Sequence, residues 1–399
     1  MKEQPVFLEQ IHIRNFLSLR DAVLPLKRLT VLVGPNASGK SNILSSLKLL
    51  RRMISSATSP LAKYIPNMVW AGGADDIEFQ LQMKSDNIPI HYRLVLRTEY
   101  QDENRIGIEE LVIGKVKVIS VENGRGEVND EDDKNPTRYC PSKPKLALGS
   151  ASDYGNKPVT SALIEFIRGW KFCDFEPDIM REGDNDTDTF TERKSKLFDR
   201  LPMLDGDGYN LKDILSYLSE KDRVRFDSVN EAFEACTKRK IEYRNNDGDD
   251  DDNLYVCEGC EHPVSLRKAS DGTMRLLAYQ VLANLPELPS LIAIEEPERN
   301  LHPAALKEIA SILERLSERT QVIITTHSSQ LLDAFNPENL SDQLGVLLLQ
   351  NIPGKGTKVI NLEEKRKDRE ALNGWMSDFG IGSAVFDSEL LQDITESRL

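Results

Sequence analysis

The chain has 399 residues, of which 39% are hydrophobic and 29% charged, and its formal net charge is −14. This length allows two or three domains, or one large α/β domain with insertions. A chain this acidic does not coat nucleic acid with its whole surface, so nucleic-acid contact would need a local basic groove. No apolar run approaches the roughly 20 residues that span a bilayer, and the N-terminus lacks an apolar signal core. We therefore expect a cytoplasmic protein without membrane contact.

The first part of the chain carries patterns of both strands and helices. Residues 7–16 alternate roughly between apolar and polar side chains, as a half-buried strand does. Residues 29–34 form an apolar run suited to a buried parallel strand. Residues 41–54 place their apolar side chains on one face, which predicts a helix. Further strands and the turns of a hairpin region are expected at 77–83, 90–97, Gly107, Gly114 and Gly124.

The middle of the chain, from about 159 to 238, has a helical pattern without a heptad repeat long enough for an extended coiled coil. The strand signal returns near 254. The remaining elements are expected in this order: a helix after Ser270, a strand at 290–294, a helix at 303–317, a strand at 321–327 and a hairpin turning at 353–356.

The stretch GPNASGKSN, residues 34–42, fits the phosphate-loop pattern G-x-x-x-x-G-K-[ST] between an apolar strand and an amphipathic helix. Consecutive backbone N–H groups at a helix N-terminus cradle phosphate oxygens, and glycines allow the close approach. Lys40 would neutralise the β and γ phosphates, and the Ser41 hydroxyl would bind Mg²⁺. The residues expected to bind the nucleotide are Gly34, Pro35, Asn36, Ala37, Ser38, Gly39, Lys40, Ser41 and Asn42.

The stretch LIAIEEPERNLHP, residues 291–303, runs from four apolar residues into the adjacent carboxylates of Glu295 and Glu296. Neighbouring carboxylates repel each other, so a positive charge must keep them ionised beside an apolar strand. In a sheet that also carries the phosphate loop, Glu295 would hold Mg²⁺ directly or through water. Glu296 would orient and activate the attacking water. The alternative is a surface acidic turn after a core strand.

Two further stretches lie where a nucleotide site would need them. His327 follows the apolar strand in ITTHS, residues 324–328, at the strand end where ligands bind in α/β sheets, and could hydrogen-bond the γ-phosphate. The alternative is a structural histidine that satisfies the core or a cap. Ser270 begins SDGT, residues 270–273, and by its local residues this stretch is equally an ordinary capped helix.

Together these residues resemble the ABC-type ATPases, in the non-transporter branch that includes SMC, RecF and the OLD-like prokaryotic ATPases. IHIRNFLSL (11–19) is similar to the N-terminal signature of that branch, and SDGT, IEEPERNLHP (294–303) and ITTHS follow in the family's order. The matches cover roughly residues 6–50 and 265–335. The resemblance implies an α/β fold: an ABC-type P-loop ATPase head with a mostly parallel sheet, an antiparallel β subdomain and a helical insertion. Its predicted parts are an N-terminal lobe at 1–158, the insertion at 159–253 and a C-terminal lobe at 254–399.

The resemblance further implies that ATP and Mg²⁺ bind between two heads arranged head to tail. One head would supply Lys40, Ser41, Glu295, Glu296 and His327. The other would reach across with Ser270 and Gly272. By the same resemblance, Arg14 would lie near the nucleotide and Asn300 in the loop at the dimer seam.

The chain departs from the family pattern in three ways. Asp271 stands where the transporter signature has a glycine, which favours the non-transporter branch. Glu295 replaces the commoner aspartate on the metal side, so metal coordination through it can be indirect. For the glutamine lid loop, Gln80 and Gln82 are candidates only by their order along the chain.

For some other features we favour a structural interpretation over a functional one. The motif CEGC (257–260), with His262 nearby, is expected to hold reduced thiols rather than zinc, because no second ligand pair stands at usable spacing. The acidic runs at 129–135 and 245–253 are expected to be solvated loops. Aromatic residues in the tail 372–391 are expected to pack onto the head, or otherwise to anchor a partner or second subunit.

The function that the residues and the resemblance together imply is an ATP-hydrolysing switch that dimerises on ATP and acts on nucleic acid or on an effector partner such as a nuclease or toxin. DNA repair and antiphage defence are the matching roles in the family. The alternatives are a nucleotide-gated scaffold with little turnover, a transport cassette, and a self-contained OLD-type nuclease. The stretch after His327 is too short for the Toprim nuclease domain that the last would carry.

Overall fold

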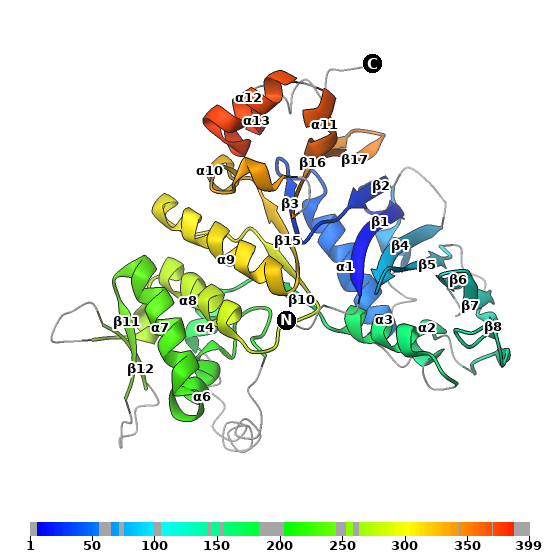
Figure 1. The fold of residues 1–399 in the computed structure, drawn as a ribbon, viewed down its shortest axis with the longest axis horizontal. Helices are drawn as coiled ribbons and strands as arrows, with labels where there is room; N and C mark the ends of the chain where they lie inside the picture. Colours follow the sequence, from blue (N-terminus) through cyan, green and yellow to red (C-terminus); the bar gives the residue numbers. More distant parts are fainter. Residues whose placement is uncertain are drawn as a thin grey trace.

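The computed structural model describes residues 6–55, 65–71, 76–98, 105–142, 145–151, 155–182, 203–244, 253–257, 263–340, 343–368 and 370–386. A six-stranded sheet runs through the middle of the molecule, and an eight-stranded antiparallel sheet lies to one side of it (Figure 1). Helices fill the space between the two sheets and cover the opposite face of the central sheet. In the part of the chain described, no helix combines the length and apolar character of a membrane-spanning segment.

The central sheet positions the predicted site. Its strands, in spatial order, are β10 (Trp170–Cys173), β14 (Leu291–Glu295), β15 (Gln321–Thr326), β3 (Leu29–Val33), β16 (Leu344–Ile352) and β17 (Gly356–Asn361). The first five are parallel, and β17 pairs with β16 as an antiparallel hairpin. All five residues of β3 are buried, because both faces of a parallel sheet are covered and the strand needs apolar side chains on each.

The second sheet is antiparallel throughout. Its strands, in spatial order, are β2 (Leu19–Pro25), β1 (Phe7–Phe16), β4 (Ile77–Ser85), β5 (Ile88–Leu96), β6 (Ile106–Ile113), β7 (Val116–Glu122), β8 (Arg125–Val128) and β9 (Thr137–Tyr139). One hydrophobic core joins this sheet to helices α1 (Lys40–Ser55), α2 (Leu148–Ala151) and α3 (Pro158–Arg168) and to one face of the central sheet. Leu32 of β3 points into this core, whereas its neighbours Val31 and Val33 point the other way.

A second core covers the opposite face of the central sheet. Its helices are α4 (Pro177–Glu182), α6 (Leu211–Lys221), α7 (Arg223–Thr237), α8 (Asp271–Asn284), α9 (Leu306–Arg319) and α10 (Ser329–Asp333). A small sheet of β11 (Lys240–Tyr243), β12 (Leu254–Cys257) and β13 (Val264–Ser265) packs beside them, and the chain continues into α11 (Leu362–Asp368), α12 (Glu370–Phe379) and α13 (Ile381–Phe386). Short 3₁₀ turns span Ile65–Met68, Leu266–Lys268, Pro303–Ala305 and Pro337–Asn339.

The strands and helices predicted outside the middle segment are confirmed, with ends that differ by a few residues. Gly114 and Gly124 occupy turns with positive φ, but the turn predicted at Gly107 is wrong, since that residue lies inside β6. The helical pattern at 159–238 also hides β10, whose four residues, WKFC, pair with β14 in the central sheet. A strand this short and without alternation gives little signal between two helices.

The acidic run at 129–135 is a loop, as predicted, but only residues 132–135 are exposed to solvent. Asp130 is buried and pairs with Lys157 at 3.1 Å, and Glu131 accepts hydrogen bonds from the backbone N–H groups of Val159 and Thr160 at the start of α3. The run therefore anchors a helix. Residues 245–252 of the other acidic run, and 258–262 with most of CEGC and His262, lie outside the described residues.

The predicted packing of the tail holds for one aromatic residue and not for two. Phe386 packs against the second core, whereas Trp375 and Phe379 are 41% and 65% exposed, with ring centroids 6.0 Å apart on α12. The remainder of the predicted tail, 387–391, lies outside the described residues.

Candidate nucleotide-binding site

Three neighbouring parallel strands of the central sheet end side by side. The register pairs Val33 at the end of β3 with Thr326 of β15, and Thr325 with Glu295 at the end of β14. The phosphate-loop stretch, the paired glutamates and His327 therefore leave the sheet at one edge. The sequence placed them far apart in the chain, and the parallel pairing brings them together.

The loop after β3 encloses the amine of Lys40. Its Nζ donates hydrogen bonds to the carbonyl oxygens of Gly34 (2.7 Å) and Pro35 (3.0 Å), and the residue is only 7% exposed. Burial lowers the pKa of Lys40, while the carboxylates of Glu296, Glu298 and Glu295 act to raise it. The lysine is thus a cation held among acids, which is the positive charge that the sequence required.

Two glycines of this loop are needed for its shape. A Cβ on Gly34 would lie 2.3 Å from the carbonyl oxygen of Leu349, and Gly39 has a φ of 105°, a conformation that favours glycine. Pro35, Asn36 and Ala37 are exposed at the tip of the loop, whereas Ser38 is buried. The Ser38 hydroxyl has no hydrogen-bond partner among the described residues. A polar group left unpaired beside a phosphate-loop pattern fits a ligand with acceptor oxygens.

Two residues to which the sequence analysis gave no individual role, Ser18 and Thr357, support the loop from outside. The Thr357 hydroxyl, on β17, donates a hydrogen bond to the carbonyl oxygen of Ser38 at 3.1 Å and lies 2.7 Å from the Ser18 hydroxyl. Asn42 donates to the same Ser18 oxygen at 2.8 Å. The β1–β2 turn and the C-terminal hairpin thereby fix the phosphate loop, a contact that separation along the chain concealed.

Ser41 and Glu295 meet directly, since the serine hydroxyl donates a hydrogen bond to the Glu295 carboxylate. A hydroxyl and a carboxylate are oxygen ligands of the kind that Mg²⁺ prefers. The contact between Ser41 and Glu295 lies at the first turn of α1, where the metal is predicted to bind. The glutamate side chain, which is longer than the commoner aspartate, spans the gap between β14 and α1. These two residues would hold the metal.

Glu296 and His327 form a pair at the open side of the same edge. The Glu296 carboxylate lies 3.0 Å from His327 Nδ1, and the two side chains are 25% and 53% exposed. The backbone N–H of Glu296 donates to Thr325, to both its carbonyl and hydroxyl oxygens at 3.1 Å. Its φ of 44° is unusual for a residue with a side chain, and such strain persists where surrounding contacts impose it. The two side chains that the sequence predicted to act beside the γ-phosphate therefore contact each other at the strand ends.

The residues of the predicted signature lie in a separate group. The Ser270 side chain caps α8 by accepting from the Thr273 backbone N–H at 3.4 Å, and a Cβ on Gly272 would come within 3.0 Å of the Asn300 carbonyl oxygen. Asp271 accepts hydrogen bonds from Arg181 and, at 3.3 Å, from the Asn300 side chain. Residues 270–273 and Asn300 line a groove of about 730 Å³ with the start of α9. Within the described chain, their hydrogen bonds join them to one another and not to the phosphate loop.

Arg14 and the two candidate lid glutamines lie on the eight-stranded sheet. Arg14 forms ion pairs with Asp21 (3.2 Å) and Glu78 (3.4 Å), and Gln80 donates to Glu78 at 2.8 Å, while Gln82 is exposed on the same strand, β4. In the ranges that the structure describes, neither ion-pair partner of Arg14 belongs to the phosphate loop. The nucleotide roles of these three residues stay predictions.

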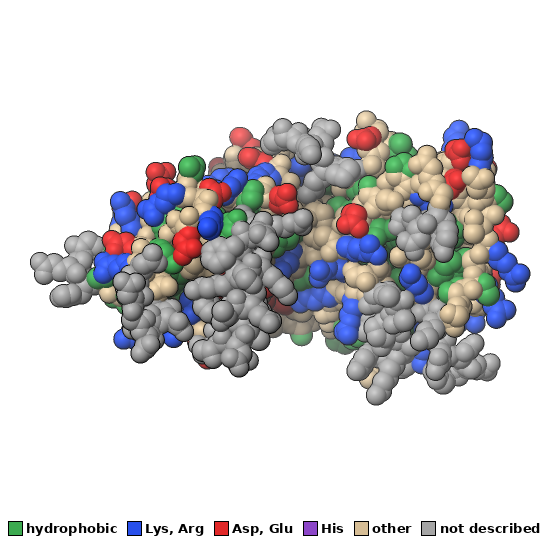
Figure 2. Space-filling model, turned by 90° about the horizontal axis from the view of Figure 1, so that it is seen from below, with side chains coloured by type: hydrophobic (Ala, Val, Ile, Leu, Met, Phe, Trp, Pro, Cys, Tyr) green, Lys and Arg blue, Asp and Glu red, His purple; other side chains and the backbone are tan. Residues whose placement is uncertain are grey.

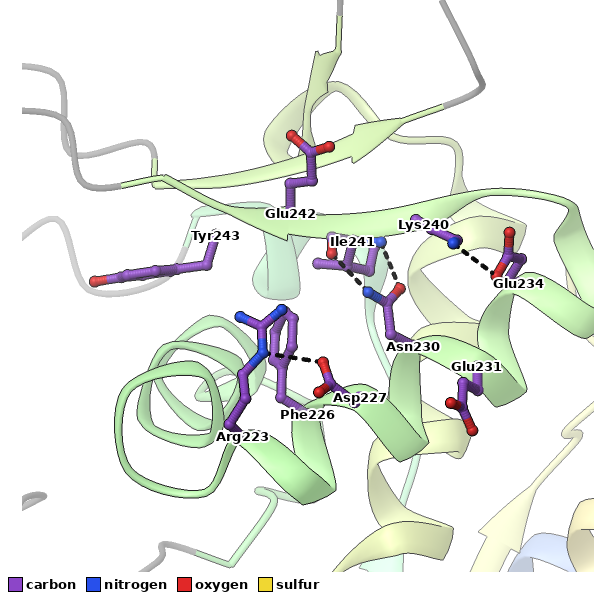
Figure 3. A pocket seen from close by; sticks show the side chains of 10 residues that line it. All are labelled: Arg223, Phe226, Asp227, Asn230, Glu231, Glu234, Lys240, Ile241, Glu242 and Tyr243. Atoms are coloured by element: carbon purple, nitrogen blue, oxygen red, sulfur yellow. Dashed lines mark hydrogen bonds and ion pairs between the residues drawn. The ribbon is translucent and has the colours of Figure 1, made fainter.

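A second hollow, of about 420 Å³, lies between α7 and β11, away from these residues (Figure 3). The Asn230 side chain bridges its floor by bonding both the N–H (2.7 Å) and the carbonyl oxygen (2.8 Å) of Ile241. Asp227, Glu234 and two basic residues line it with ion pairs of their own. None of the residues predicted for nucleotide binding lines this hollow.

Known proteins resemble the chain at the level of family and of fold. The model of an AAA ATPase domain matches residues 7–165, and that of an AAA domain described as putative AbiEii toxin, Type IV TA system, matches residues 182–333. The Old nuclease of Escherichia phage P2 is 26% identical over 367 residues, which cover 84% of this chain. The chain spans 58% of the length of that nuclease.

Two solved structures share the fold at low sequence identity. An SMC head bound to the C-winged helix domain of ScpA is similar with a TM-score of 0.53 and 15% identity, over 90% of this chain and 99% of the other. An Smc head with an extended coiled coil, bound to the C-terminal domain of ScpA derived from Pyrococcus furiosus, has a TM-score of 0.50 and 14% identity, over 92% and 99%.

The fold is that of an SMC head, an α/β fold consistent with the ABC-type P-loop ATPase head that the sequence predicted. The two ATPase-domain models and the curated relative support an ATP-binding protein that is similar to the SMC and OLD ATPases.

Proposed function

We propose that this chain is a Mg²⁺-dependent ATPase that works as a switch: it pairs with a second copy when ATP is bound and separates after hydrolysis. The observation that carries the proposal is the Glu296–His327 pair, 3.0 Å apart, at the sheet edge that also holds Lys40 and the Ser41–Glu295 contact. Phosphoryl transfer to water requires a cation that binds the phosphate, oxygen ligands that hold a metal, and a base that activates the water. The residues at this edge supply all three kinds of group.

In the proposed reaction, Glu296 takes a proton from a water molecule as the water oxygen bonds to the γ-phosphorus. The bond from that phosphorus to the bridging oxygen of ADP breaks, which gives ADP and phosphate. His327 contacts the Glu296 carboxylate through Nδ1 and can stabilise that carboxyl group once it has received the proton. Lys40 balances charge on the phosphate oxygens. Mg²⁺, held by Ser41 and Glu295, would supply further charge neutralisation.

Pairing with a second copy is supported by the separation of the two groups of predicted residues. Ser270 and Asn300 are exposed beside the groove between α8 and α9, and their contacts do not reach the phosphate loop of their own chain. A triphosphate held by one head could therefore be completed by Ser270 and Gly272 of another, which is how the family builds its composite site.

The partner class is proposed from the relatives. The curated relative is named a nuclease, and one family model is described as a putative toxin of a toxin–antitoxin system. Both SMC heads were solved with a domain of ScpA. Lys and Arg side chains gather near the middle of the face in Figure 2, although the whole chain is acidic. We therefore propose nucleic acid or an effector protein as the target of the switch, in DNA repair or antiphage defence.

The test of this proposal is the oligomeric state of Glu296→Gln with saturating Mg²⁺ and ATP. Because the variant keeps the phosphate loop but loses the base, it is expected to accumulate as an ATP-bound dimer in sedimentation velocity. Ser270→Arg in the same background is the matched control and should remain monomeric. A Glu296→Gln protein that binds ATP and stays monomeric would overturn the composite site.

A further inference from the structure

Glu298 is a third acid of the EEPE stretch, and its setting differs from that of the first two. It is 9% exposed, so it lies beneath the open edge of the sheet rather than at it. Its Oε1 accepts hydrogen bonds from the Thr326 hydroxyl at 2.5 Å and from the backbone N–H of His327 at 3.4 Å. The side chain thus ties the turn after β14 to the end of β15, directly at the residue that carries the imidazole.

The second carboxylate oxygen, Oε2, is buried and has no hydrogen-bond partner within the described ranges. The hydroxyl of Tyr279 on α8 is also buried and has no hydrogen-bond partner within the described ranges. Burial raises the pKa of Tyr279, and the nearby Glu298 carboxylate raises it further. Leaving a buried polar group unpaired costs on the order of 1–3 kcal/mol. The carboxylate stands at this position despite that cost, and its contacts through Oε1 are with the two residues at the end of β15.

We propose that Glu298 is a positioning residue for ATP hydrolysis, which holds His327 against Glu296 by fixing the end of β15 to the turn after β14. The inference rests on the proposed function, because it concerns the same site. Glu296 is already fixed from its N-terminal side by Thr325. Glu298, two residues later, links the same turn to the end of β15, where His327 lies, through one carboxylate oxygen.

The expected consequence is a loss of turnover without a loss of ATP binding. Glu298→Ala removes the link, and a shift of about 1 Å in a catalytic group can cost roughly 100-fold in rate. We expect kcat to fall about 100-fold with KM within about threefold of wild type, because Lys40 and Ser41 keep their contacts. Glu298→Gln retains an oxygen that accepts both hydrogen bonds and should keep kcat within about threefold.

These two variants decide between a positioning role and a charge role. If Glu298→Gln is as slow as Glu298→Ala, the negative charge is needed, and the proposed link is wrong. If Glu298→Ala keeps the wild-type kcat, the proposal fails altogether. Thermal unfolding of both variants establishes that they are folded under the assay conditions.

Thr326→Val tests the other end of the link, since it keeps the shape of the side chain and removes the donor. The substitution also removes the acceptor of the Ser328 backbone N–H, which lies 3.0 Å from the Thr326 hydroxyl. Combined with Glu298→Ala, it should therefore lower kcat by a smaller factor than it does alone, because the contact that the two residues share is already broken. Two effects that multiply would contradict a shared link.

Hydrogen exchange separates this inference from the proposed function. If the wild type releases no phosphate from ATP with Mg²⁺, the ATPase proposal fails, and the role of Glu298 must then be judged from hydrogen exchange instead of kcat. The His327 amide should nevertheless exchange at least about tenfold faster in Glu298→Ala than in the wild type or Glu298→Gln, because its acceptor is gone. Equal exchange in all three proteins would overturn the link itself.

Discussion

Two buried carboxyl groups, Glu109 in the eight-stranded sheet and Glu298 at the edge of the central sheet, are held in different ways. Glu109 lies on β6 with no exposed surface, and both of its oxygens accept hydrogen bonds. The donors are the Tyr92 hydroxyl (3.0 Å) and the backbone N–H groups of Ala147 (2.6 Å) and Leu148 (2.8 Å). Glu298 has partners for one oxygen only.

The difference indicates a structural role for Glu109 and a role at the nucleotide site for Glu298. A buried polar group whose partners are all in place rigidifies its surroundings, and Glu109 does so by fixing the start of α2 to β5 and β6. Glu298 joins two loops that carry exposed polar side chains, at the edge where parallel strands end. The antiparallel sheet can therefore be expected to respond to mutation in stability, and the edge of the central sheet in nucleotide binding and turnover.

The largest effect that would sharpen this comparison is expected from Lys40→Ala. Removal of the amine from the phosphate loop should weaken ATP binding by at least about 100-fold, since a cation at the β and γ phosphates is lost. Isothermal titration with ATP and Mg²⁺ measures it. Lys48→Ala, an exposed lysine on the same helix, is the matched control and should bind normally. Unchanged affinity in Lys40→Ala would remove the phosphate-loop assignment.

A stability effect with a defined pH dependence is expected from Glu109. Burial raises the pKa of Glu109 from 4.5 to about 7, so the folded chain holds this proton more tightly than the unfolded chain. The contribution to stability is therefore full below pH 4.5 and is lost as pH rises through 7, by about 3 kcal/mol in total. Urea unfolding at pH 5 and pH 8 should show this fall in the wild type.

Glu109→Gln is the control for that measurement, because an amide does not titrate. It should lower the free energy of unfolding at every pH, since its NH₂ group faces a backbone donor, but lose this part of the pH dependence. ATP binding should be unchanged. An identical pH dependence in both proteins would show that Glu109 does not titrate in this range.

The smallest effect is expected from Arg14→Ala. Arg14 is 44% exposed, and solvent-exposed ion pairs such as those with Asp21 and Glu78 contribute about 0–1 kcal/mol. A change in the free energy of unfolding within that range, with unchanged ATP affinity, would make Arg14 part of the antiparallel sheet alone. A clear loss of ATP affinity would instead support the nucleotide role that the family resemblance implies.

The sequence was most informative where chemistry requires fixed spacing. Gly34, Gly39, Lys40 and Ser41 were recognisable because phosphate binding demands those residues in that order after a buried strand. Glu295 and Glu296 stood out because two acids directly after apolar residues need a compensating charge. Three of the parallel strands, β3, β14 and β15, were predicted from continuous apolar runs, and the ABC-type fold followed from the order of the motifs.

What the sequence concealed depends on contacts between distant segments. Ser18 and Thr357 support the phosphate loop through hydrogen bonds that no local pattern indicates. Asp130 appeared as one acid in a solvated run, yet its pairing with Lys157 buries it. The strand β10 was lost inside a helical segment because four residues carry no measurable period. Glu298 was visible as an acid, but only the fold shows that it faces inward.

The most direct test of the central claim is phosphate release by the wild type and by Glu296→Gln at saturating ATP and Mg²⁺. A general base contributes on the order of 10²–10⁴-fold to rate. We therefore predict that Glu296→Gln binds ATP with wild-type affinity and releases phosphate at least about 100-fold more slowly. Equal rates of release from the two proteins would contradict the account.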